Sequence, residues 1–133
     1  MRIFYSRHSD PMLLDTAAEL NALQSRLAEF LASPETNISI PALVTLSPAP
    51  YERFLRGLRL QKTQDRVCLR LVEDDWLELS GSNAYLTKYV SYFRFEPSEE
   101  DGHHHPDNAN YMAPGSLRLI IEADSTWSTA NAG

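Results

Sequence analysis

Several features that would point to a function are scarce or missing in this chain of 133 residues. It has one cysteine, Cys68, so no internal disulfide can form and a reducing compartment is expected. No apolar run approaches the roughly 18 residues that cross a bilayer. The N-terminal sequence MRIFYSRHSD also lacks the apolar segment of a signal peptide. The sequence therefore predicts a cytoplasmic protein with no membrane partner.

Catalytic motifs are missing as well. There is no Gly-x-Ser-x-Gly elbow, no Walker loop and no Gly-x-Gly-x-x-Gly fingerprint. Cys68 lies in an alternating strand pattern, which favours a half-buried structural residue over a nucleophile. Ser80-Gly81-Ser82 precedes an expected helix and is explained by capping at least as well as by anion binding. No catalytic residue is assigned, and a non-enzymatic role is favoured.

Positive charge is in the minority, with 12 Lys and Arg against 18 Asp and Glu and a net charge of −6. Nucleic-acid-binding domains are usually basic, so nucleic acid is a disfavoured partner. Six of the positive charges nevertheless fall between Arg53 and Arg70. A phosphate or nucleic-acid binder that uses Arg59 and Arg70 on a sheet face is therefore kept as a second alternative. The simpler interpretation is a solvated sheet face.

Apolar periodicity predicts more strands than helices. Period two predicts three half-buried antiparallel strands joined as a meander, over residues 57–62, 66–71 and 76–80. Further strands are expected at residues 1–5, 38–40, 43–46 and 116–123. Helical spacing predicts one helix over residues 15–32 and another that starts at Ser82 or Asn83 and stops before Pro97.

The start of the first helix has two candidates. Asp10-Pro11 suits an N-cap followed by the first helical residue, and Thr16 with Glu19 forms a capping box. Taken together, the pattern predicts one α+β domain over residues 1–123. Its antiparallel sheet of about five strands carries two amphipathic helices on one face, and residues 124–133 form a flexible tail.

The segment richest in potential chemistry is Glu96–Asp107, called the acidic loop below. Alternate residues of an extended chain point the same way, so His103 and His105 can act together there. With a nearby carboxylate they would suit a transition-metal ion such as zinc, although no distant His or Cys has motif spacing to complete the set. A metal-binding protein is thus the first alternative; otherwise no cofactor is expected.

An acidic loop also suits recognition of a basic protein, because opposite charge accelerates the capture of a partner. The leading hypothesis is a non-catalytic protein-binding role with this loop as the contact region. The candidate contact residues are Glu99, Glu100, Asp101, His103, His105 and Asp107.

Two blocks of the chain resemble a known family. DWLELSGSNAYLTKYVSYFRF (75–95) and HHHPDNANYMAPGSLRLIIEA (103–123) are similar to segments of the Imm32-type immunity proteins of bacterial polymorphic toxin systems. The resemblance spans roughly residues 57–123. The Pro-rich stretch at 34–52 has no counterpart, and HHHPD stands where a strand-like H-x-H is expected. The resemblance implies a protein that binds and neutralises a cognate toxin, and it assigns no catalytic residue.

Overall fold

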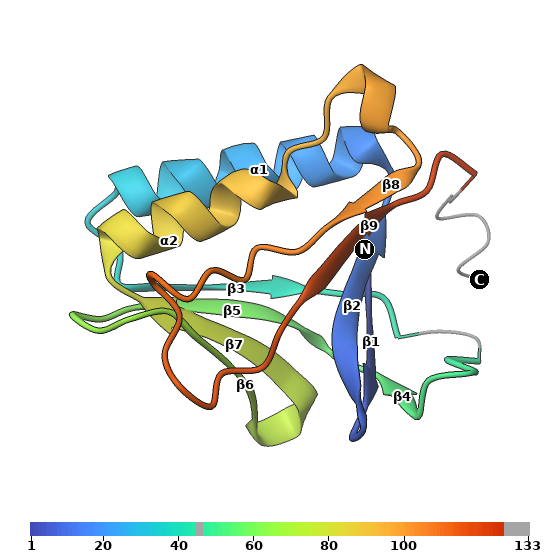
Figure 1. Cartoon of the computed structure of the whole chain (residues 1–133), viewed down its shortest axis with the longest axis horizontal. Helices are drawn as coiled ribbons and strands as arrows, with labels where there is room; N and C mark the ends of the chain where they lie inside the picture. Colours follow the sequence, from blue (N-terminus) through green and yellow to red (C-terminus); the bar gives the residue numbers. More distant parts are fainter. Residues whose placement is uncertain (45–46, 127–133) are drawn as a thin grey trace.

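A computed structural model of the chain describes residues 1–44 and 47–126. It confirms the α+β class, but its strands form two sheets rather than one. Figure 1 shows both helices lying side by side over the four-stranded sheet. The helices and strands in chain order are β1 (Arg2–Ser6), β2 (Ser9–Asp15), α1 (Ala17–Ala32), β3 (Asn37–Pro41), β4 (Arg53–Phe54), β5 (Gly57–Lys62), β6 (Cys68–Val72), β7 (Trp76–Gly81), α2 (Asn83–Val90), β8 (Gly102–His104) and β9 (Ile120–Ala123).

The four-stranded sheet has the order β3-β5-β7-β6. The three regular strands are therefore not a meander: β5 pairs with β7 in parallel, and β6 lies on the far side of β7. Half-buried strands with the same alternation look alike in sequence, so the pattern cannot tell which neighbour a strand takes. The expected strand at 38–40 is confirmed as β3, which pairs with β5 at the opposite edge.

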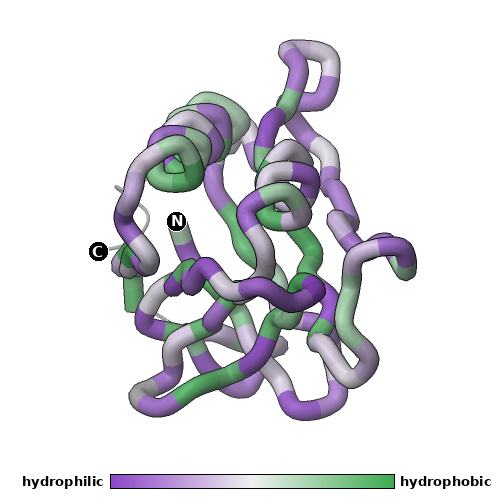
Figure 2. The backbone as a smooth tube through the Cα atoms, turned by 90° about the vertical axis from the view of Figure 1, so that its left-hand side faces the viewer, coloured by the Kyte–Doolittle hydropathy of each residue, from purple (hydrophilic) through white to green (hydrophobic). Residues whose placement is uncertain are grey.

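Because side chains alternate along each strand, leucines of this sheet lie on the face that the helices cover. Leu60, Leu79 and Leu69 lie opposite one another across β5, β7 and β6, and all three are fully buried. One cluster of buried apolar side chains includes residues of both sheets and both helices. Figure 2 shows apolar stretches along the strands and hydrophilic residues in the projecting loops. Burial of this face, at about 25 cal/mol per Å², is the main force that holds the helices to the sheet.

The five-stranded sheet has the order β4-β1-β2-β9-β8. Its strand β2 corrects the proposal that Asp10-Pro11 begins a helix, since both residues belong to that strand. Pro11 fits there because the β1–β2 ladder is irregular between Phe4 and Ser6, and a missing N–H is tolerated at an irregularity. The last expected strand is shorter than predicted, because only Ile120–Ala123 is paired.

Helix α1 begins where the capping box predicts. The Thr16 hydroxyl accepts a hydrogen bond from the Glu19 backbone N–H at 3.2 Å. Helix α2 is capped in the same way by Ser82, but it ends at Val90 and a short 3-10 turn follows, well before Pro97. Among the described residues, no helix is long and apolar enough to cross a membrane.

Two expectations fall partly outside the described residues. The strand expected at 43–46 includes residues 45 and 46, which are not described, and residues 43 and 44 form no strand. The flexible tail expected at 124–133 is described only as far as residue 126.

Candidate functional site

The acidic loop contains regular structure that the sequence pattern did not predict. A 3-10 turn, Pro97–Glu99, is followed by strand β8, which pairs antiparallel with β9. Figures 1 and 2 agree that the turn projects beyond both helices. His103 lies in β8 and His105 directly follows that strand, and the side chains of both are exposed. Their rings lie 5.1 Å apart, edge to face.

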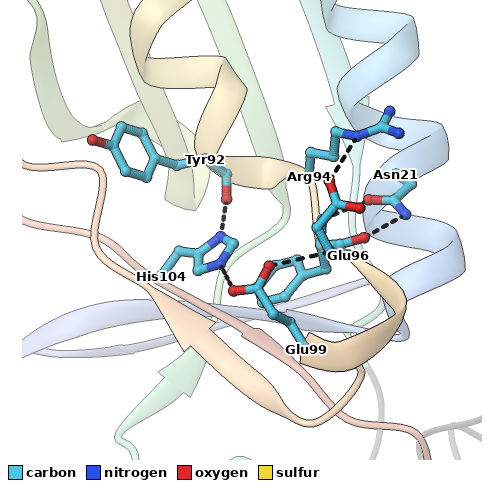
Figure 3. Close-up of polar contacts among 7 residues, drawn as sticks. Asn21, Tyr92, Arg94, Glu96, Glu99 and His104 are labelled. Atoms are coloured by element: carbon cyan, nitrogen blue, oxygen red, sulfur yellow. Dashed lines mark hydrogen bonds and ion pairs between the residues drawn. The ribbon is translucent and has the colours of Figure 1, made fainter.

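His104 points the opposite way and anchors the loop (Figure 3). Its Nδ1 lies 2.7 Å from the Tyr92 carbonyl oxygen, and its Nε2 lies 2.8 Å from Oε2 of Glu99. The ring also stacks on Phe95, with centroids 4.0 Å apart and planes 3° apart. Three contacts thus hold one imidazole, of which only 19% of the side chain is exposed.

The partners of His104 determine how its two ring nitrogens can bond. A carbonyl oxygen only accepts, so the contact with Tyr92 is a hydrogen bond when Nδ1 carries the hydrogen. An ionised carboxylate also only accepts, so the contact with Glu99 is a hydrogen bond when Nε2 carries a hydrogen. In the doubly protonated form of the ring, the contact with Glu99 is an ion pair.

Glu99 links this histidine to the 3-10 turn. Its Oε1 accepts the Glu96 backbone N–H at 3.2 Å while Oε2 faces His104. The hydrogen bond from His104 and then the backbone hydrogen bond at Glu96 lower the pKa of the Glu99 carboxyl below its ordinary value. The carboxylate is consequently committed to the internal structure of the loop.

A side-chain amide joins the loop to helix α1. Asn21 Nδ2 donates to the Phe95 carbonyl at 2.9 Å, and the Phe95 N–H donates to Asn21 Oδ1 at 2.7 Å. Both backbone groups of a nearly buried residue are thus satisfied by one side chain. Arg94 and Glu96 form a further, exposed ion pair at 3.7 Å beside this clamp (Figure 3).

Asp101 is also engaged within the protein. Its carboxylate accepts the Ser125 N–H at 2.7 Å and the Ser125 hydroxyl at 2.8 Å. These hydrogen bonds lower the pKa of Asp101 and tie the segment after β9 to the acidic loop.

The six predicted contact residues therefore fall into three groups. Glu99 and Asp101 hold the loop together, whereas Glu100, His103 and His105 are exposed. Asp107 is partly buried at the end of the loop, where desolvation raises the pKa of its carboxyl.

Sequence reasoning missed His104, Asn21 and Phe95. Strand alternation placed His104 opposite its neighbours, but nothing in the sequence indicated what it would contact. Asn21 lies 74 residues from Phe95, so no local pattern could pair them.

In the acidic loop as described, the imidazoles of His103 and His105 are the only candidate metal ligands that lie together. Among residues 1–44 and 47–126, no three His, Cys, Asp or Glu side chains are grouped so as to hold a metal ion. Zinc binding through His103 and His105 accordingly stays a prediction.

The sheet face predicted to bind phosphate has its arginines engaged. Arg70 pairs with Glu78 at 2.9 Å, which raises the pKa of the guanidinium through that hydrogen bond. Arg59 lies over the Trp76 ring at 5.0 Å and donates to the Ser39 hydroxyl. The structure thus brings an aromatic ring among these arginines, which the sequence pattern did not predict, while Glu78 offsets part of their charge.

Comparison with known proteins finds no matching family model, no matching curated protein and no matching solved structure.

Proposed function

We propose that this protein binds another protein without catalysing a reaction, and that the acidic loop is its contact region. The observation that carries the proposal is the internal anchoring of the loop. His104, Glu99 and Asn21 hold it in one conformation, while Glu100 and His103 remain exposed.

Anchoring matters because association must offset the entropy of ordering both surfaces. A loop that is already ordered loses little conformational freedom when a partner docks, so more of the contact energy appears as affinity. Packing within the fold does not by itself require that the 3-10 turn project beyond the helices. A rigid projecting loop that exposes the Glu100 carboxylate and the His103 and His105 imidazoles suits recognition.

The partner's charge follows from the charge of the chain. A net charge of −6, with carboxylates on the projecting turn, favours the approach of a basic surface. The resemblance to Imm32-type immunity proteins gives this partner a specific form, a basic toxin neutralised in the cytoplasm.

Co-expression tests the proposal directly. The protein encoded immediately upstream of this chain's gene is produced with the wild-type chain, with Glu100→Lys, and with Glu29→Lys as the control on exposed helix α1. We expect capture by the wild type and by the control, and about tenfold weaker binding by Glu100→Lys at low salt. The proposal fails if no complex forms and deletion of the gene never sensitises the cells.

Metal binding is the alternative that a specific contact supports, the 5.1 Å approach of the His103 and His105 rings. Elemental analysis of untagged, gently purified protein decides it. Stoichiometric zinc, nickel or copper that is lost in a His103→Ala, His105→Ala double variant would support the alternative. Sub-stoichiometric metal in the wild type would remove it.

A further inference from the structure

Residues of the segment 107–118, together with Arg66, line a half-open pocket beside the outer edge of β6, on the opposite side of that strand from β7. The pocket has a volume of about 590 Å³, within the range of small-molecule sites. Its wall includes the two arginines Arg66 and Arg118 and the apolar side chains of Met112 and Pro114. We call it the β6-edge pocket.

The wall of the β6-edge pocket is fixed by hydrogen bonds to the strand edge. Val67 exchanges backbone hydrogen bonds with Tyr111 and Ala113, at 2.8 and 2.7 Å. Two residues on, the Leu69 N–H donates to the Ser116 hydroxyl, also at 2.8 Å. The segment behaves as a partial extra strand, so the pocket exists before any ligand arrives and binding orders little of the chain.

The two guanidinium groups in this wall differ from those of Arg53 and Arg70 in how their charge is balanced. Arg70 and Arg53 each form an ion pair with a carboxylate, at 2.9 and 3.3 Å. Within the described part of the chain, Arg66 instead donates only to backbone carbonyls, at 3.3 and 3.5 Å. Among the described residues, Arg118 has no ion pair or side-chain hydrogen bond, and its charge opposes the rise in the pKa of the nearby Asp107 carboxyl.

Asp107 does not neutralise both arginines. One of its carboxyl oxygens is buried and has no hydrogen-bond partner among the described residues. The charged side chains in the wall are therefore two guanidinium groups and one partly buried carboxylate, a local positive excess in an acidic chain. Guanidinium groups bind carboxylate and phosphate oxygens through paired, charge-assisted hydrogen bonds.

We propose that the β6-edge pocket binds a small organic anion. Arg66 and Arg118 hold its carboxylate or phosphate, and Met112 and Pro114 contact its apolar part. This site is separate from the acidic loop and does not depend on the protein partner proposed above.

Titration with small aromatic probes, followed by ¹⁵N NMR of the whole chain, tests this site. Phenyl phosphate and benzoate carry the two anionic groups, and benzamide is the neutral counterpart of benzoate. We expect both anions to shift the amide signals of residues 112–118, and benzamide to leave them unchanged. The tighter of the two anions identifies the preferred group.

Variants then separate a built site from general charge attraction. Arg118→Gln and Arg66→Gln should each weaken binding by about tenfold or more, as expected for a lost charge-assisted hydrogen bond. Arg118→Lys keeps the charge and should lose less, and Arg7→Gln, on the exposed β1–β2 turn, should change nothing. Arg66 also donates hydrogen bonds to backbone carbonyls of the wall, so its replacement alters the pocket itself. Arg118→Gln is therefore the decisive variant. Unchanged binding in that variant, equal binding of benzamide, or shifts spread over the surface would overturn the proposal.

Discussion

The imidazole of His104 lies flat on the ring of Phe95, with the ring centroids 4.0 Å apart and the planes 3° apart. Phe95 is only 2% exposed, so the histidine rests on the edge of the hydrophobic core while its nitrogens reach Tyr92 and Glu99. Parallel stacking at this distance brings the two ring faces into direct van der Waals contact. This stack joins the acidic loop to the body of the protein.

Removing that side chain should loosen the loop. His104→Ala deletes two hydrogen bonds and the stack, so we expect a loss of about 1–2 kcal/mol in the free energy of unfolding. Faster amide hydrogen exchange should appear at residues 96–104. The exposed His105 provides the control. The free energy of unfolding of His105→Ala should stay within about 0.5 kcal/mol of the wild-type value. Equal effects of the two variants would show that His104 is no anchor.

Acid should weaken the same contact. The pKa of Glu99 is lowered in the folded protein, so the unfolded chain binds its proton first as the pH falls. The stability that Glu99 contributes is complete above its ordinary value of 4.5 and is lost as the pH drops through the lowered value. Urea unfolding of the wild type and Glu99→Gln should therefore differ most near neutral pH and converge in acid. A constant difference would contradict this origin.

The Asn21 clamp gives a graded test. Asn21→Ala leaves both backbone groups of Phe95 without their partner and should cost about 1–2 kcal/mol of unfolding free energy. Asn21→Asp keeps the acceptor for the Phe95 N–H but places a carboxylate oxygen against the Phe95 carbonyl oxygen, and repulsion between these two acceptors should make its loss at least as large. Ser25→Ala, on the exposed side of α1, should have little effect. Chemical denaturation of all three variants gives the comparison.

Gly57 should not tolerate a methyl group. A Cβ there would lie 2.3 Å from Cζ3 of Trp76 and 2.4 Å from the Ile40 carbonyl oxygen. Gly57→Ala should therefore destabilise the protein by about 1–3 kcal/mol, because backbone as well as side chain must move.

Gly102→Ala is the matched control for that substitution, since its nearest neighbour would be the Glu99 carbonyl at an ordinary 3.6 Å. Adding Trp76→Ala to Gly57→Ala should relieve only part of the loss, as the Ile40 carbonyl stays in place. Full recovery in the double variant would mean that the indole alone excludes the methyl group.

Local chemistry explains which parts of the fold were predictable. Thr16 and Ser82 cap the two helices because a short hydroxyl side chain can satisfy a free N–H, and that signal lies within four residues. Strand alternation likewise records which face of a strand is buried. Both signals belong to single elements and need no knowledge of neighbours.

Pairing between elements could not be predicted in the same way. The parallel contact of β5 with β7 depends on which neighbour β5 takes in the sheet, and β6 carries the same alternation as β7. Asp10-Pro11 was a candidate helix start, so β2 was missed. At the site, the exposed histidines followed from alternation, but the contacts of His104 arise only once β8 and the two 3-10 turns after α2 are assembled.

Strand β9 lies inside the five-stranded sheet, between β2 and β8, although it is the last described strand along the chain. A chain made from its N-terminus can form the β1–β2 hairpin early, but β8 has no strand to pair with until residues 120–123 have emerged. The acidic loop is therefore the part of the molecule that vectorial synthesis completes last. A nascent chain stalled before Ile120 would present its helices and four-stranded sheet without a finished acidic loop.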